Sequence, residues 1–376
     1  MSDYSKEAVR RLNGVQRNCL KYLKENLEAE TFGRVMSLNY SNGRLPDYTD
    51  AIQTSFYMLK YAKFYMFEYY LMYDLAIRNL AIMGYGEIQK NPYVISFGSG
   101  SGVDALALKY ALYKYQNQAK LSEYEKVKHC YYTGLDKCNW PEISKPDLNH
   151  LDFDLVRSVN SNIADVSEGY LKYANVLFFP KVLSELGDTE DGPSQVIDSI
   201  CEKIRNTSLN KDIVAICASY RGERNMSENI RLQKVIDAYK EKGYEVVKTI
   251  VPVNWAGLHL LDRGKDSIFT VSEKKRNTNL WKFDDFIIDP EIWEYLGAKG
   301  EIRKKCPEFK YVTDTNTKCG DVCWEKCKYS NDCGLRPIPR VRLYSEEIQT
   351  CFRIVMLCKK RPVPSIPVVT YVSEIN

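Results

Sequence analysis

Apolar residues at helical spacing predict two helices in the N-terminal part of the chain. The first helix covers residues 5–30, where successive apolar positions lie three to five residues apart: Val9, Leu12, Val15, Leu20, Leu23 and Leu27. A turn-rich stretch follows, and Asp47 or Thr49 is expected to cap a second helix that ends near Met83.

The second helix is unusually aromatic, with rings on several faces: Phe56, Tyr57, Tyr61, Phe64, Tyr65, Phe67, Tyr69, Tyr70 and Tyr73. Two interpretations are open. The rings pack into a core with the tyrosine hydroxyls at its edges, or they form a lid that covers a substrate.

From Asn91 the pattern changes to short apolar runs separated by helical segments, which is typical of an α/β sheet. We predict helices over residues 103–115 and 227–242, and seven strands: 93–97, 128–135, one ending near Asp165, 175–179, 212–218, 245–251 and 348–357. Periodicity is poor between Val253 and Ser345. The expected division is therefore an N-terminal helical region (1–90), a Rossmann-like core (91–255), an inserted Cys-rich subdomain (256–344), and a final core strand with a C-terminal tail (345–376).

Composition fits an ordinary globular protein. The 376 residues are 44% hydrophobic and 27% charged with a net charge of +4, which excludes a disordered or collagen-like chain. The most apolar stretch, 56–73, is interrupted by Lys60, Lys63 and Glu68, so no membrane span is expected. The N-terminal residues lack the apolar run of a secretion signal, and we expect a cytoplasmic location.

A glycine loop follows the first predicted strand and opens the next helix. Gly98, Gly100 and Gly102 let a ligand approach the backbone, and the helix start presents unpaired N–H groups. A dinucleotide-binding loop would need glycine where Val103 stands, and the Gly-Lys-Ser/Thr of a Walker loop is absent. Both nucleotide interpretations are therefore weakened.

The loop resembles the first motif of the class I S-adenosylmethionine-dependent methyltransferases. The resemblance implies that the residues around the loop hold the methionine part of the cofactor: Phe97, Gly98, Ser99, Gly100 and Gly102. It also implies that Asp136, at the end of the second strand, binds the ribose hydroxyls, and that Asp165 lies near the adenine. The resemblance covers residues 91–255 and the strand near 348–357, with an extra segment around 116–125.

The family faces its substrate at the end of the fourth strand, which makes Pro180, Lys181, Ser184 and Glu185 the candidate substrate contacts. The Asp/Asn-Pro-Pro-aromatic motif of enzymes that methylate exocyclic base amines is missing here. Methyl transfer depends on placing the nucleophile and excluding water, so no catalytic acid or base can be assigned. The three histidines have no mutual ligand spacing and are interpreted as structural or exposed.

Cysteines concentrate near the C-terminus, where residues 301–376 hold seven of the twelve. Cys319, Cys323, Cys327 and Cys333 are predicted to bind a metal, with Cys306 as a substitute ligand. This spacing matches neither a zinc ribbon nor a ferredoxin, and zinc is favoured over an iron–sulfur cluster because it tolerates irregular spacing. Unligated thiols are the alternative.

The leading functional hypothesis is an S-adenosylmethionine-dependent methyltransferase with an unidentified acceptor. The rival is a catalytically silent binding or assembly factor, because the layout is also similar to the methyltransferase-like assembly factors of the mitochondrial small ribosomal subunit, which carry an iron–sulfur cluster. RNA is a partner under that rival, and Arg336, Arg340 and Arg342 would then contact phosphate. A nicotinamide-dependent oxidoreductase is disfavoured by Val103.

Overall fold

The computed structural model describes most of the chain up to the sixth strand and short pieces beyond it. The described residues are 4–26, 47–83, 91–116, 129–148, 155–160, 162–187, 194–220, 226–252, 268–271, 280–282, 347–349 and 351–359. All four cysteines predicted to bind a metal, and Cys306, lie outside these ranges.

Eight strands of the described residues form one twisted sheet in the order β3-β2-β1-β4-β5-β10-β6-β7. The strands are β1 (Tyr93–Phe97), β2 (Tyr131–Asp136), β3 (Leu155–Asn160), β4 (Val176–Phe179), β5 (Ile213–Ser219), β6 (Tyr244–Pro252), β7 (Ile268–Val271) and β10 (Phe352–Lys359). Strand β10 runs antiparallel to both β5 and β6, and the other neighbouring pairs are parallel. A separate antiparallel pair joins β8 (Leu280–Lys282) to β9 (Glu347–Gln349).

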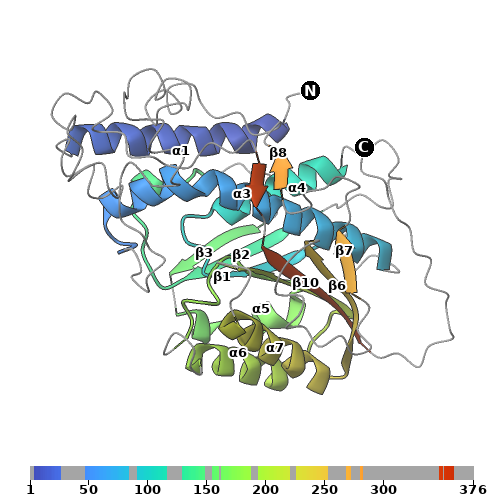
Figure 1. Cartoon of the computed structure of the whole chain (residues 1–376). Coiled ribbons are helices and arrows are strands. Elements are labelled where there is room, and N and C mark those ends of the chain that lie inside the picture. The colour runs from blue at the N-terminus through green and yellow to red at the C-terminus, as the bar shows by residue number, and fades with distance from the viewer. Residues whose placement is uncertain are drawn as a thin grey trace, which may run out of the picture.

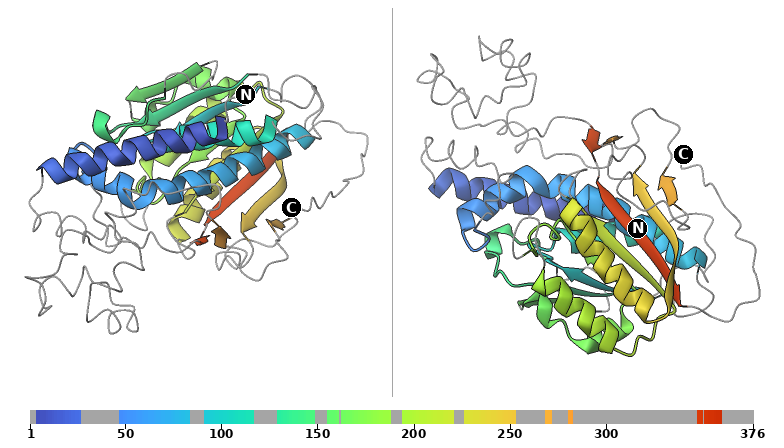
Figure 2. Two further views of the ribbon diagram at one scale, coloured as in Figure 1. Left: turned by 90° about the horizontal axis from the view of Figure 1, so that it is seen from above. Right: turned by 60° about the horizontal axis from the view of Figure 1, so that its bottom comes forward.

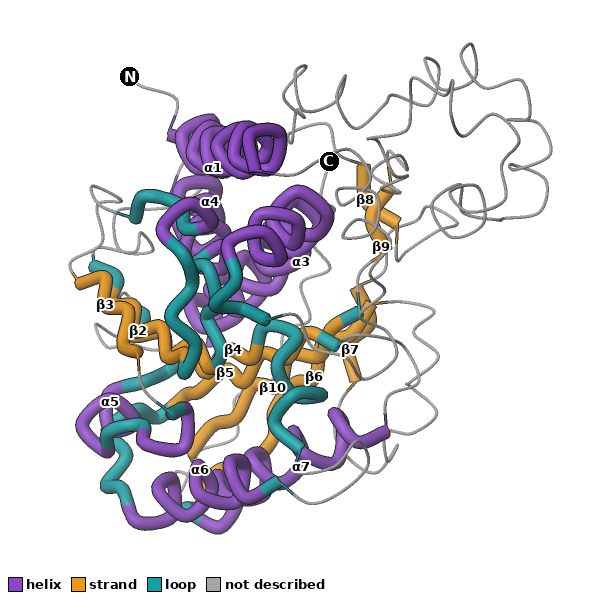
Figure 3. The backbone as a smooth tube through the Cα atoms, turned by 90° about the vertical axis from the view of Figure 1, so that its left-hand side faces the viewer, coloured by secondary structure: helices purple, strands orange, loops and turns teal. Residues whose placement is uncertain are grey.

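Helices cover both faces of the sheet and give three layers (Figures 1 and 3). One outer layer holds α1 (Tyr4–Asn26), α3 (Ala51–Met83) and α4 (Val103–Gln116), and the other holds α5 (Glu168–Tyr173), α6 (Gln195–Asn206) and α7 (Met226–Glu241). Seen from above, α1 and α3 run side by side across the sheet (Figure 2).

Each face of the sheet buries its own hydrophobic core. The strands carry apolar side chains on both faces, as Ile95 and Val94 of β1 illustrate: Val94 packs with the α1, α3 and α4 layer, and Ile95 with the opposite layer. This two-sided burial explains why β4 and β5 are fully buried along their length.

Helix α3 begins at a cap that differs from the expected one. Asp50 caps it, because its carboxylate accepts hydrogen bonds from the N–H groups of Ile52 (2.7 Å) and Gln53 (3.0 Å). Part of the aromatic surface of α3 is core, as expected from the first interpretation: the Tyr73 ring stacks on Phe178 of β4 at 4.2 Å between centroids.

The structure differs from the sequence-based expectation at several elements. The main sheet of the described residues has eight strands instead of seven, because β7 adds an edge strand from the segment expected to be inserted. Strand β3 ends at Asn160, and Asp165 belongs instead to a single 3-10 turn (Ile163–Asp165). Helices α5 and α6 were not expected. No helix among the described residues is both long and apolar enough to cross a membrane.

Candidate functional site

A cleft of about 490 Å³ lies at the carboxyl ends of β1, β2 and β4 and extends beneath α3. Between β1 and β4 the strand order reverses: β2 and β3 follow on one side of β1, and β5 follows on the far side of β4. Ligands of open α/β sheets bind at such a topological switch point. The lining residues on the glycine-loop side are Gly98, Ser99, Gly100, Ser101, Val103, Asp104, Asp136, Lys137, Cys138, Asn162 and Ile163. Those on the α3 side are Asp47, Tyr48, Thr49, Tyr57, Met58, Ala62, Tyr65, Tyr69 and Trp140, with Pro180, Lys181, Val182, Glu185, Leu186, Gly187 and Val196 from beyond β4.

The glycine loop adopts backbone angles that side chains disfavour. Gly98, Gly100 and Gly102 have φ values of +79°, +57° and +90°. There is also no room for a side chain at Gly98, because a Cβ there would lie 2.5 Å from Cγ2 of Val182. The loop is tied to the end of β2, since the N–H groups of Gly98 and Ser99 both donate to the carbonyl of Leu135, at 2.7 and 3.1 Å.

Asp136 joins the glycine loop to the β2 edge of the cleft. Its Oδ2 accepts a hydrogen bond from the N–H of Gly100 at 2.8 Å, and its Oδ1 accepts one from the N–H of Cys138 at 2.8 Å. Burial raises the pKa of this carboxyl above its usual value, and the two N–H donors oppose that rise. Asp136 lines the cleft, and its carboxylate is held there by the glycine loop on one side and by the turn after β2 on the other.

A second carboxyl, Asp104, is buried at the first turn of α4. The Tyr132 hydroxyl donates a 2.7 Å hydrogen bond to its Oδ2, whereas its Oδ1 has no partner among the described residues. Burial raises the pKa of Asp104 to about 6. This acid lies against the cleft directly after the glycine loop.

Aromatic rings form a continuous wall on the α3 side of the cleft. Tyr48 stacks on Trp140 at 4.9 Å between ring centroids, and Tyr57 meets both edge-on, at 5.8 and 5.5 Å. Tyr65 extends the wall from Tyr57 at 5.9 Å, and Tyr69 follows at 5.8 Å. The wall reaches the glycine loop, because a Cβ on Gly100 would lie 3.2 Å from the Trp140 ring.

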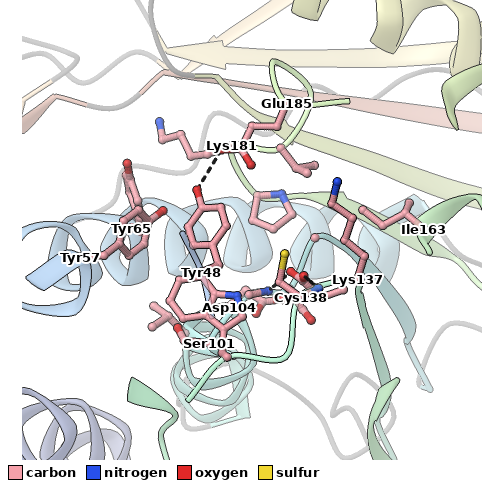
Figure 4. A pocket seen from close by; sticks show the side chains of 18 of the residues that line it. Tyr48, Tyr57, Tyr65, Ser101, Asp104, Lys137, Cys138, Ile163, Lys181 and Glu185 are labelled. Atoms are coloured by element: carbon pink, nitrogen blue, oxygen red, sulfur yellow. Dashed lines mark hydrogen bonds between the residues drawn. The ribbon is translucent and has the colours of Figure 1, made fainter. Parts of the chain in front are cut away.

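Beyond β4, charged side chains meet this wall (Figure 4). The Tyr48 hydroxyl donates to Oε1 of Glu185 at 3.1 Å, which joins the start of α3 to the loop after β4. Lys181 Nζ lies 2.8 Å from Oε1 of Glu68 and 5.6 Å from the centroid of the Tyr65 ring. Lys181 has a positive φ of 54°, a strained conformation for a non-glycine residue.

Glu68 anchors this region from the inside of α3. Its side chain is only 3% exposed, and it also accepts hydrogen bonds from the Ser219 hydroxyl and from the N–H of Cys351, the latter at 2.8 Å. Lys181 in turn donates to the carbonyl of Tyr220. One buried ion pair therefore links α3 with the ends of β4 and β5 and the start of β10.

The structure brings most of the predicted site residues to this cleft and leaves four outside its lining: Phe97, Gly102, Asp165 and Ser184. Phe97 is fully buried behind the loop and stacks on Phe179 at 4.8 Å. Asp165 is exposed, and its neighbours Asn162 and Ile163 line the cleft instead. Ser184 is absent from the lining, and its carbonyl accepts a hydrogen bond from Arg231 at 3.2 Å.

Sequence reasoning missed Tyr48, Trp140, Glu68 and Asp104. Trp140 and Tyr48 lie in connecting segments without periodicity, so no pattern marked them. Glu68 did carry a signal, because a lone carboxylate in an apolar helical run needs a partner once it is buried. Among the described residues no group of three or more His, Cys, Asp or Glu side chains is arranged to hold a metal ion.

No family model matches the chain, and no curated protein matches it. Among solved structures, the chain is similar to a candidate class I S-adenosylmethionine-dependent methyltransferase from Listeria monocytogenes. The identity is 11% and the TM-score 0.36, over 72% of this chain and 95% of the bacterial one.

Proposed function

We propose that the chain is a class I S-adenosylmethionine-dependent methyltransferase. The observation that carries this proposal is the hydrogen bond from the Gly100 N–H to Asp136, because it holds the glycine loop and the acidic strand end on one wall of a single cleft. The methionine part of the cofactor would lie over residues 98–102, and the ribose hydroxyls would bind Asp136.

Three further features support a cofactor at this place. A cleft of about 490 Å³ falls within the usual range for small-molecule sites. The glycine loop forms a cradle that side chains would obstruct at Gly98, Gly100 and Gly102. The cleft lies at the carboxyl ends of β1 and β4, the two neighbouring strands from which the sheet order runs in opposite directions, and open α/β sheets bind ligands at such a point.

The residues of the chain would bind and orient the reactants and exclude water. When bound, the cofactor would supply the methyl group, and its transfer needs a nucleophile aligned near the methyl carbon in a water-poor site. The aromatic wall provides such a boundary, since Trp140 and Tyr69 are each 5% exposed. Pro180, Lys181 and Glu185 border the acceptor side, and Ser184 would support it from behind.

The Cys-rich segment adds a separate proposal that rests on the sequence. A structural zinc ion or iron–sulfur cluster would be held by Cys319, Cys323, Cys327 and Cys333. These residues come more than 100 positions after the last residue that lines the cleft. A silent assembly factor on the same scaffold is the rival function, and cofactor turnover separates the two.

Calorimetry with S-adenosylhomocysteine, the demethylated product, tests the cofactor site. Asp136→Ala removes two charge-assisted hydrogen bonds to the ribose and should weaken binding at least about a hundredfold. Gly100→Val should block binding, because the added side chain would meet the Trp140 ring and the φ of +57° would be strained.

The matched control is Asp198→Ala, which removes an exposed carboxylate on α6, in the opposite helical layer, and should bind like wild type. Thermal unfolding of each variant establishes that the fold is retained. Undiminished binding in both cleft variants, or no binding by the folded wild-type protein, would overturn the assignment.

A further inference from the structure

The α3 side of the cleft combines neutral aromatic rings with carboxylates. Burial raises the pKa of the Tyr57 and Tyr69 hydroxyls well above 10, so both rings stay uncharged near neutral pH. A neutral ring face attracts a cation that lies within about 6 Å of its centroid. Lys181 already places its ammonium group in this way over Tyr65, at 5.6 Å.

Charge around the cleft favours a positively charged occupant. Four carboxyl side chains line it and only two ammonium groups do: Asp47, Asp104, Asp136 and Glu185 against Lys137 and Lys181. Glu68 lies 2.8 Å from Lys181 and balances its charge from outside the lining. Glu185 places a carboxylate at the edge of the aromatic wall, where it accepts a hydrogen bond from the Tyr48 hydroxyl.

The orientation of the rings argues against a slot for a flat molecule. A stacking slot needs two parallel ring faces with a gap between them. Tyr57 instead meets its neighbours at steep angles, 87° to Tyr48, 70° to Trp140 and 54° to Tyr65. Rings inclined to one another present faces and edges around a compact group, which is the geometry that suits an alkylammonium ion.

We propose that the half of the cleft formed by Tyr48, Tyr57, Tyr65 and Glu185 binds a small alkylamine in its cationic form, and that this amine is the methyl acceptor. The inference rests on the proposed methyltransferase function and names its substrate class. It also disfavours a nucleic-acid phosphate as the group bound here, because the carboxylates would repel it.

The reaction balances with the groups present. The bound ammonium first loses a proton, and Glu185 is the carboxylate at the wall that can accept it. The freed nitrogen lone pair then forms the bond to the methyl carbon while the carbon–sulfur bond breaks and its electrons remain on sulfur. The added methyl group restores a positive charge on nitrogen, which the same rings accept.

Choline tests the cation site without any turnover, because its quaternary nitrogen cannot be methylated again. The neutral comparison is 3,3-dimethylbutan-1-ol, which has the same shape and no charge. Calorimetry with S-adenosylhomocysteine present should show choline binding at least about tenfold more tightly than the alcohol.

Variants assign the preference to the proposed residues. Tyr57→Leu should weaken choline binding about five- to thirtyfold, whereas Tyr57→Phe should stay close to wild type because it keeps the ring. Glu185→Gln should weaken choline and leave the alcohol unchanged. The control is Tyr173→Leu, an exposed ring on α5 that also has a lysine beside it, 5.5 Å away, and it should have no effect.

The outcomes separate this inference from the proposed function. S-adenosylhomocysteine should bind Tyr57→Leu and Glu185→Gln as it binds wild type. Equal binding of choline and the alcohol, or tighter binding of a flat neutral ring such as phenol, would overturn the amine site while cofactor binding stands. Ring-dependent choline binding without any cofactor binding would retain the cation site and refute the methyltransferase.

Discussion

The buried pair of Glu68 and Lys181 yields the most quantitative prediction for this fold. Their charged atoms lie 2.8 Å apart, with side-chain exposures of 3% and 13%. At an effective dielectric constant near 20, the Coulomb attraction at that distance is about 6 kcal/mol. Desolvation offsets much of it, so the net value of the pair is far smaller than this figure.

Removing one partner is expected to be more damaging than removing both. Glu68→Gln leaves the Lys181 ammonium without its counter-charge, and we expect a loss of about 3–5 kcal/mol in the free energy of unfolding. Lys181→Met leaves the Glu68 carboxylate with the donors Ser219 and Cys351, and should cost less. The double variant should be more stable than the sum of the single losses predicts, by at least about 2 kcal/mol.

Urea denaturation followed by circular dichroism measures all four proteins of this cycle. The matched control is the exposed pair of Arg205 and Glu241, whose two hydrogen bonds of 2.5 and 3.1 Å lie in solvent. Its coupling should be much weaker than that of the buried pair. Additive losses for Glu68 and Lys181, within about 0.5 kcal/mol, would refute the view that this ion pair fastens α3 to the sheet.

Three further predictions concern other parts of the molecule. Gly98→Ala should lose about 2–5 kcal/mol in urea unfolding, because its φ of +79° is strained and its Cβ would overlap Val182, whereas Gly14→Ala, in open space on α1, should be slightly stabilising. The folded pKa of Asp104, about 6, lies above the ordinary 3.8, so the folded state holds that proton more tightly: stability should fall by about 2 kcal/mol between pH 4 and 6, and the decline should be absent from Asp104→Asn. Elemental analysis of the full chain should find zinc or iron that is lost in Cys323→Ser, and a metal-free native protein in which the four thiols of Cys319, Cys323, Cys327 and Cys333 all react freely with a thiol reagent would contradict the cysteine prediction.

Local patterns sufficed for the parts of the site whose chemistry is confined to a few consecutive residues. The glycine loop and the first strand could be predicted because a strand, a turn and a helix start follow one another within Tyr93 to Asp104. Asp136 was singled out through the family resemblance, as the acidic residue at the end of the second strand, and β2 does end there. Strands β4 and β5 were equally visible, since both are continuous apolar runs that the sheet buries on two faces.

Residues whose role depends on distant contacts could not be predicted in this way. Trp140 meets Tyr48 across 92 positions of the chain, and only the folded arrangement makes them one wall. The Glu68 carboxylate accepts a hydrogen bond from the N–H of Cys351, which lies 283 residues further along the chain. Helix α6 was a different kind of miss, because Ile197, Ile200 and Ile204 do lie at helical spacing and were overlooked between two stronger strands.

Strand β10 has a consequence for how this protein is made. It fills the position between β5 and β6, yet Phe352 follows Pro252, the end of β6, by 100 residues. At about 5–20 residues per second, a ribosome needs roughly 5–20 s to synthesise that interval. During this time β5 and β6 are complete but have no strand between them, and their unpaired edges are open to wrong partners. Folding of the sheet during synthesis therefore waits for its last strand, and a chaperone that shields those two edges should increase the yield of native protein.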